Sequence, residues 1–152
     1  MRIMKKFILL LILFQFTAIT HSETLKLNIL YGKWQLLYRG SYGYHFQFHP
    51  DFRSLCIIYL GASAAIFKGV YTLEDETTIR INIYEMKTEN AVSNINLYSN
   101  FTKVTKTYFI FHGRYSETNN TKCLELDSVK TIIDGVNSEG YFEPEIKLNK
   151  IE

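Results

Sequence analysis

Apolar and polar residues alternate along most of the chain in short runs that are interrupted by turn residues. The alternation is clearest at 77–84, where three isoleucines occupy every second position between polar residues. A period of two is typical of a β-strand with one buried face and is not produced by a helix. The runs that indicate strands are 32–39, 42–48, 54–60, 65–72, 77–84, 93–101, 106–114 and 121–127, with a further strand at 145–151.

These runs predict an all-β domain, because no stretch of the chain shows a helical period and no internal repeat is present. The connections between runs are too short for the crossovers that parallel strands require, so the strands should pair antiparallel. Such a sheet must protect its edges by closing on itself or by packing on a second sheet. We therefore predict a small antiparallel up-and-down barrel of about eight strands, with a two-sheet sandwich as the alternative.

The start of the chain has the three zones of a secretory signal peptide. Arg2, Lys5 and Lys6 form a basic beginning, 7–16 is an apolar run, and Ser22 is a small residue suited to cleavage. The apolar run is about half of the ~20 residues that span a bilayer as a helix. We therefore expect cleavage near Ser22 rather than a retained membrane anchor.

Cleavage divides the chain into a signal peptide at 1–22 and a barrel domain at 23–152, which we expect to be secreted or periplasmic and to have no membrane span. The signal peptide holds three of the 17 Lys and Arg residues and none of the 15 Asp and Glu residues, so the mature chain has a formal charge of −1. A chain of this charge lacks the basic surface that nucleic-acid binding requires. We therefore predict no nucleic-acid partner.

Composition supports a folded domain that is rich in strands. The chain is 47% hydrophobic and 21% charged, which is enough apolar surface for a core, and its eleven Tyr and eleven Phe favour strands. Two cysteines are too few for a disulfide-dense scaffold or a four-thiolate zinc site. Cys56 and Cys123 could form one disulfide in an oxidising compartment. The alternation, however, places both side chains outward on non-adjacent strands, which would keep them apart. A disulfide and two separate thiols therefore both stay open.

The first predicted strand begins with Gly32-Lys33-Trp34, which contains the only tryptophan of the chain. A Gly-x-Trp motif at this place in a small exported barrel resembles the signature of the lipocalins and the wider calycin group. The aromatic second strand, which ends before Asp51, and Gly69-Val70-Tyr71 are similar to divergent bacterial lipocalin-like domains of unknown function. The resemblance covers about 30–127 and implies a barrel whose closed end is plugged by the indole.

Aromatic residues occupy the positions that the alternation assigns to the barrel interior. Eight strands enclose either a filled core or one small-ligand cavity. Bulky rings on nearly every strand favour a filled interior, and a ligand cavity remains the alternative. The side chains that would line such a cavity are Trp34, Tyr38, Tyr44, Phe46, Tyr59, Phe67, Tyr71 and Tyr108.

No local motif indicates catalysis or a metal site. Gly-x-Ser-x-Gly is missing, and His45 and His49 would lie ~13 Å apart along one strand, too far to share a metal. We predict no enzymatic activity, no cofactor and no metal. The leading hypothesis is an exported protein that binds a small hydrophobic ligand in the barrel mouth. The alternative is a protein-interaction factor of the envelope or secretome, such as a protease-inhibitor-like barrel.

Overall fold

A computed structural model describes residues 22–39, 41–90 and 95–152 of the chain. The predicted signal peptide lies, except for its last residue, outside the described residues. Within the described part, the strands and the one short helix are β1 (Ser22–Glu23), α2 (Leu27–Leu30), β2 (Gly32–Tyr38), β3 (Tyr42–Phe48), β4 (Arg53–Leu60), β5 (Ala64–Leu73), β6 (Thr78–Glu89), β7 (Thr102–Thr118), β8 (Thr121–Ile133), β9 (Val136–Asn137) and β10 (Glu145–Lys150).

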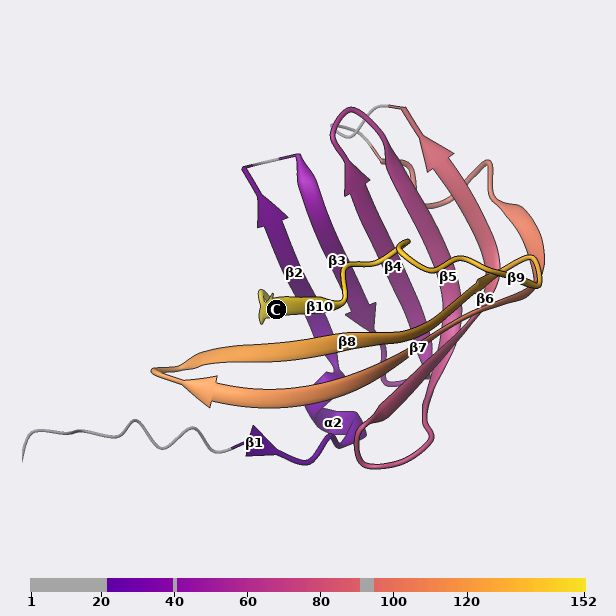
Figure 1. The fold of residues 1–152 in the computed structure, drawn as a ribbon. Coiled ribbons are helices and arrows are strands. Elements are labelled where there is room, and N and C mark those ends of the chain that lie inside the picture. The colour runs from indigo at the N-terminus through magenta and orange to yellow at the C-terminus, as the bar shows by residue number, and fades with distance from the viewer. Residues whose placement is uncertain (1–21, 40, 91–94) are drawn as a thin grey trace, which may run out of the picture.

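The strands form a closed antiparallel barrel, as the sequence predicted. Strands β2 to β8 pair in chain order, and β10 lies between β8 and β2, so that eight strands of the described residues complete the ring. The two short strands are additions, β1 beside β7 and β9 beside β8. Figure 1 shows the long β7–β8 hairpin crossing in front of the sheet formed by β2 to β6. The fold class is therefore an up-and-down barrel and not a sandwich.

Side chains alternate between the interior and the outer face of the barrel. Ile79, Ile81 and Ile83 are buried in the core, whereas Arg80 and Asn82 line the outer face of the same strand. This is the arrangement that the period of two predicted for β6. The described interior is packed with aromatic rings rather than empty, which agrees with the filled alternative.

One predicted strand is wrong. The described part of the run 93–101, residues 95–101, contains no strand. Its side chains Ile95, Leu97 and Phe101 instead pack on an outer cluster of apolar residues on β4 and β5. Because these side chains cover the outer face of β4, that strand is apolar on both faces. The strand that completes the barrel in place of the predicted one is β10. The outer cluster consists of Leu55, Ile57, Ala64 and Ile66.

One end of the barrel, here called the floor, is closed by α2 and Trp34. The indole is fully buried, its Nε1 donates a hydrogen bond to the Leu30 carbonyl at 2.7 Å, and its ring lies edge-on to Tyr115 with centroids 6.4 Å apart. Gly32 has φ +116°, and a Cβ there would lie 2.2 Å from the Glu152 carbonyl oxygen. Only glycine therefore allows the chain to enter the barrel at this point, as the Gly-x-Trp resemblance implied.

Candidate functional site

The opposite end of the barrel, the mouth, is closed by residues 138–144, the mouth segment, which connects β9 to β10. In Figure 1 this yellow coil runs from β9 across the front of the barrel to β10. Phe142 projects from the segment into the core, where only 4% of its surface is exposed. Its ring centroid lies 4.9 Å from that of Phe109 and 5.1 Å from that of Phe111. The protein thus fills the upper interior with its own side chain.

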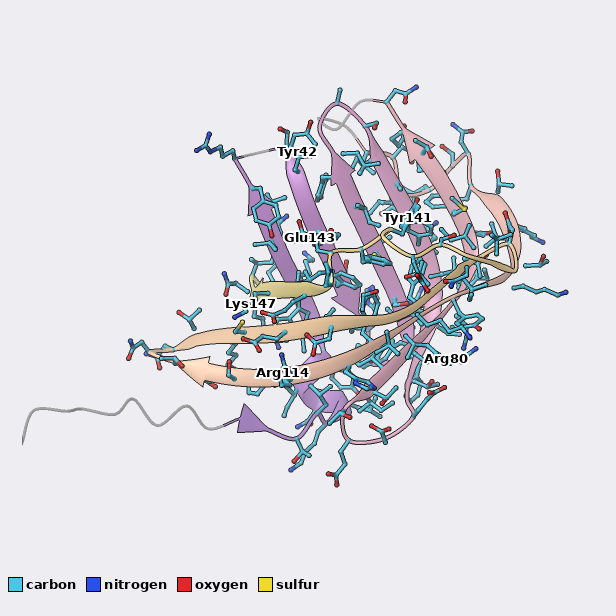
Figure 2. The ribbon with its side chains drawn as sticks, viewed as in Figure 1. Tyr42, Arg80, Arg114, Tyr141, Glu143 and Lys147 are labelled. Atoms are coloured by element: carbon cyan, nitrogen blue, oxygen red, sulfur yellow. The ribbon has the colours of Figure 1, made fainter. Side chains whose placement is uncertain are left out.

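Hydrogen bonds from both sides hold the mouth segment in place. The Glu143 backbone N–H donates to the Tyr44 hydroxyl at 3.2 Å, and the Glu143 carboxylate accepts from the Tyr38 hydroxyl at 2.9 Å. The two ends of the segment bond to β8, where Ser128 N–H donates to the Pro144 carbonyl at 3.0 Å. Figure 2 shows Tyr141 and Glu143 along this segment, with Tyr42 near the upper rim. Glu143 is therefore the residue that ties the segment to β2 and β3.

A pocket of about 140 Å³ lies beside the mouth segment and is called the mouth pocket. Its walls combine aliphatic side chains with tyrosines and one carboxylate. Part of the rim is apolar and exposed, since Tyr42 is 57% and Leu60 is 51% exposed and the two residues are partners in the β3–β4 ladder. The lining residues are Tyr38, Tyr42, Gly43, Tyr44, Ile58, Tyr59, Leu60, Tyr141 and Glu143.

Four tyrosines of the mouth pocket, Tyr38, Tyr44, Tyr59 and Tyr141, have raised pKa values and keep their hydroxyl protons at neutral pH. Burial raises the pKa of Tyr44, Tyr59 and Tyr141 above the ordinary value for a phenol. The pKa of Tyr38 is also raised, chiefly because its hydroxyl donates to the Glu143 carboxylate. The hydroxyls of Tyr44, Tyr59 and Tyr141 are therefore available as hydrogen-bond donors to a ligand, whereas the Tyr38 hydroxyl already donates to Glu143. The Glu143 carboxylate is an acceptor.

Five of the eight predicted lining residues face the barrel core. Trp34 lies at the floor, and Phe46, Phe67 and Tyr71 are fully buried among other side chains. Tyr44 reaches from the core to the mouth pocket. Tyr38 is 44% exposed and lies at the rim rather than in the interior. The predicted residues thus do not form one cavity, and of the core-facing five only Tyr44 lines the mouth pocket.

The predicted inward orientation of Tyr59 and Tyr108 is wrong. Cys56 and Ile58 face the core, so Tyr59 points outward, packs against the outer cluster and touches the mouth pocket only at the rim. On β7 the inward residues are Phe109 and Phe111, which places Tyr108 on the outer face. Both errors have the same cause, because a strand with apolar residues on each side leaves its inward face undefined in the sequence.

The two cysteines are free and lie on opposite sides of the barrel wall. Cys56 is buried in the core, where burial raises the pKa of its thiol, while Cys123 is only partly buried beside the inward-facing Leu124. The outward orientation predicted for Cys56 is therefore wrong. A disulfide between them does not form in this structure, because the barrel wall separates the two thiols.

The sequence interpretation missed the mouth segment. Tyr141, Phe142 and Glu143 follow the last clear alternation, and they lie between two turn-forming residues, Gly140 and Pro144. An aromatic pair in such a loop carries no period that would assign it to the interior. The available signal was only that two adjacent aromatic residues are unusual in a solvated connection.

No metal or membrane element is found in the described ranges. Across 22–39, 41–90 and 95–152, no three His, Cys, Asp or Glu side chains lie close enough together to hold a metal ion. None of the helices described there has the length and apolar character needed to cross a membrane. His45 lies on the outer face, where burial, followed by the nearby Lys33 charge, lowers its pKa.

Comparisons with family models, with curated proteins and with solved structures found no match to this chain. The closed eight-stranded antiparallel barrel is compatible with the lipocalin-like fold that Gly32-Lys33-Trp34 implied. Function must therefore be argued from the chemistry of the sites themselves.

Proposed function

We propose that this chain is an exported, lipocalin-like, non-enzymatic protein that binds one small amphipathic molecule in the mouth pocket. The observation that carries the proposal is the pocket itself, in which Ile58 and Leu60 provide apolar walls and Glu143 provides a polar group between tyrosine hydroxyls. Such a mixture of apolar walls and a few polar groups is typical of small-molecule sites. Export is proposed from the basic, apolar and small-residue zones of 1–22.

The volume of the mouth pocket limits the size of the ligand. A drug-sized molecule requires ~300–1,000 Å³, whereas an apolar cavity of ~150 Å³ accepts benzene. The mouth pocket, at about 140 Å³, therefore suits a molecule with a single ring. A retinoid or a long fatty acid would require the Phe142 ring to leave the core.

The charge of the mouth pocket limits the head group of the ligand. Among the lining residues, Glu143 is the only Asp, Glu, Lys, Arg or His. A ligand carboxylate would be repelled by this group, while an amine or a hydroxyl could donate to it. Tyrosine faces also attract cations. We therefore infer that the ligand combines one apolar ring with an amine or hydroxyl group.

Three probes that share one ring and differ only in the head group test the proposal. Benzylamine, benzyl alcohol and benzoate are titrated into the mature protein, and tyrosine NMR signals are followed. The first two should shift signals of Tyr38, Tyr44 and Tyr141 and leave Tyr115 at the floor unchanged, and benzoate should bind more weakly. Glu143→Gln should weaken benzylamine binding by about tenfold, as expected for a charge-assisted hydrogen bond.

The matched control is Glu145→Gln, which removes an exposed carboxylate two residues further along the chain and outside the pocket. This variant should bind all three probes as the unmodified protein does. The proposal is wrong if none of the probes shifts the mouth signals, or if both variants weaken benzylamine equally. A protein-interaction role would then account better for the exposed rim residues Tyr42 and Leu60.

A further inference from the structure

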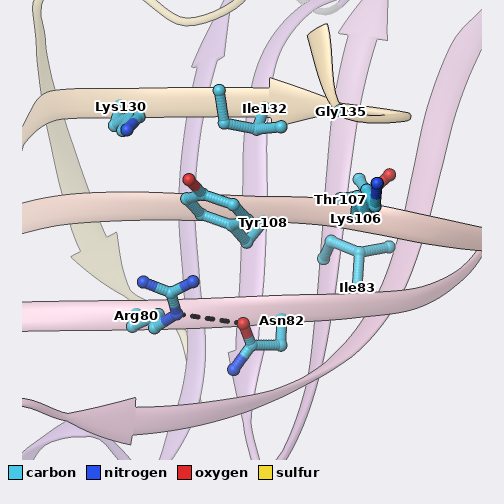
Figure 3. A pocket seen from close by; sticks show the side chains of 9 residues that line it. All are labelled: Arg80, Asn82, Ile83, Lys106, Thr107, Tyr108, Lys130, Ile132 and Gly135. Carbon is cyan, nitrogen blue, oxygen red and sulfur yellow. Dashed lines mark hydrogen bonds between the residues drawn. The ribbon is translucent and has the colours of Figure 1, made fainter. Parts of the chain in front are cut away.

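A second concave site lies on the outer face of the barrel, away from the mouth pocket. It spans β6, β7 and β8 and has a volume of about 650 Å³, which is within the range of small-molecule sites. In Figure 3, Arg80, Tyr108 and Lys130 lie in a row across these three strands. The residues that line this cationic groove are Arg80, Asn82, Ile83, Lys106, Thr107, Tyr108, Lys130, Ile132 and Gly135.

The groove gathers positive charge that the protein does not neutralise. Arg80, Lys106 and Lys130 come from three different strands. Within the part of the chain that the structure describes, neither lysine forms an ion pair, and Arg80 has only Glu74, at 3.5 Å. Like charges brought together in a concave site attract an anion from solution.

On a neighbouring part of the outer face, basic side chains do have carboxylate partners. On β7, Arg114 lies 2.8 Å from Asp127 and 3.3 Å from Glu125. On β10, Lys147 lies 3.3 Å from Glu125 and 3.2 Å from Glu145. Figure 2 labels Arg114 and Lys147 to the left of Arg80. On the β7–β8 hairpin, Arg114 therefore has two carboxylate partners, whereas Lys106 and Lys130 have none among the described residues.

Two of the three basic groups of the groove, those of Arg80 and Lys130, lie over the Tyr108 ring. The Arg80 guanidinium lies 4.1 Å from the ring centroid and the Lys130 ammonium 6.0 Å from it. Arg80 Nε also donates to the Asn82 side-chain oxygen at 3.0 Å, which orients the guanidinium. Such cation–π contacts stabilise a cation without removing its charge. Arg80, in particular, is thus oriented before a ligand arrives.

The groove also contains apolar surface next to its charges. The Tyr108 ring and Ile132 line it from the outer face, whereas Ile83, which also borders it, turns its side chain into the core. Beside them, the Thr107 hydroxyl accepts a hydrogen bond from the Asp134 backbone at 3.0 Å and donates to the Thr105 carbonyl at 3.1 Å. The hydroxyl therefore ties the connection after β8 to β7. A ligand that fits the whole groove needs an anionic end and an apolar end.

We propose that the cationic groove binds a phosphate monoester that is attached to an apolar group. The phosphate lies among Arg80, Lys106 and Lys130, whose charge matches a dianion better than a single carboxylate, and the apolar group covers Tyr108 and Ile132. This chemistry occurs in soluble aryl or alkyl phosphates and in the head group of phosphatidic acid. The proposal is independent of the ligand in the mouth pocket.

The test measures binding of two phosphate sources to the mature protein and to charge-removal variants. Phenyl phosphate is titrated by calorimetry, and vesicles of phosphatidylcholine with and without phosphatidic acid are tested by co-sedimentation. Lys106→Gln and Lys130→Gln should each weaken binding by about fivefold or more, as expected for the loss of one charge-assisted contact. Binding of phenyl phosphate in solution identifies the soluble source, and binding only to phosphatidic acid vesicles identifies the lipid source.

The matched controls are Lys103→Gln on β7 and Lys122→Gln on β8, which remove the same charge from exposed positions of the same strands outside the groove. Each control should change binding by less than about twofold, because distant surface charges are screened by salt. The proposal is overturned if the unmodified protein binds neither source. It is also overturned if the controls weaken binding as much as the groove variants, since general charge attraction would then explain it.

Discussion

The two ends of the barrel are closed in different ways. At the floor, Trp34 bonds to Leu30, a residue four positions away, and the indole is fully buried. At the mouth, Tyr38 bonds to Glu143 across 105 positions, and both side chains are exposed to solvent. The floor is thus sealed locally by the buried indole, while the mouth is sealed by a distant segment that combines the buried Phe142 ring with solvent-exposed polar contacts.

This difference separates the floor, which stabilises the fold, from the mouth, where we propose that a ligand binds. Burial of a large ring stabilises the folded protein whether or not a ligand is bound. Hydrogen bonds between exposed groups contribute little to stability, because water competes for them. Changes at the floor should therefore alter the free energy of unfolding, and polar changes at the mouth should alter binding more than stability.

The largest effect is expected for Trp34→Ala. It should lower the free energy of unfolding by about 4–5 kcal/mol, because the variant leaves a large cavity and an unpaired Leu30 carbonyl. This loss is a large share of the ~5–15 kcal/mol by which a typical domain is stable, so Trp34→Ala can fail to fold. The milder variant Trp34→Phe is therefore measured as well, and its free energy of unfolding should fall by about 1–2 kcal/mol. Urea unfolding followed by circular dichroism measures both. A loss under about 1 kcal/mol for Trp34→Ala would contradict the structural role of the floor.

Phe142→Ala should have the next largest effect. It should lower the free energy of unfolding by about 3 kcal/mol, at the lower end for a buried phenylalanine, because the mouth segment can partly collapse into the space. It should also tighten binding of benzyl alcohol, since the mouth pocket then extends into the core. Val136→Ala, at a position 65% exposed, is the control and should change stability by less than about 0.5 kcal/mol. If Phe142→Ala binds benzyl alcohol as the unmodified protein does, the mouth pocket does not extend into the core of the variant.

A pH effect is expected at the β5–β6 turn. The Asp75 carboxylate accepts four hydrogen bonds from Thr77 and Thr78, which lower its pKa from 3.8 to about 2. Because the folded pKa is the lower one, this stabilisation is present above about pH 4 and is lost as the pH falls towards 2. Asp75→Asn should therefore reduce the loss of stability between pH 4 and 2. Urea unfolding curves recorded at several pH values measure how the free energy of unfolding changes with pH. The prediction is wrong if this free energy falls as steeply in Asp75→Asn as in the unmodified protein.

The smallest effect is expected for Tyr38→Phe, which removes the hydrogen bond to Glu143 at the mouth. The free energy of unfolding should fall by only about 0.5–1 kcal/mol, because both groups are exposed. A double-mutant cycle with Glu143→Gln should give a coupling energy of similar size. A coupling energy above about 2 kcal/mol would mean that the mouth is closed as firmly as the floor.

The sequence predicted the strands better than the sites. The isoleucines of β6 and the motif around Trp34 led to correct assignments because each depends on near neighbours in the chain. Tyr59 and Tyr108 were assigned to the wrong face because their strands carry apolar residues on both sides. Phe142 was missed because it belongs to a loop without a period, and its burial depends on Phe109 and Phe111, which precede it by more than thirty positions.

By itself, the amino-acid sequence determined that the chain forms strands, since the period of two follows from local backbone geometry, and that the strands pair antiparallel, since their connections are short. The closure of one end by Trp34 was implied by the resemblance of its motif to that of the lipocalins. Only the tertiary structure decided which strand completes the ring, which segment closes the mouth, and where basic side chains lack carboxylate partners. These features arise when residues far apart in the chain become neighbours, and the period along one strand carries no information about what covers its outer face or its open end.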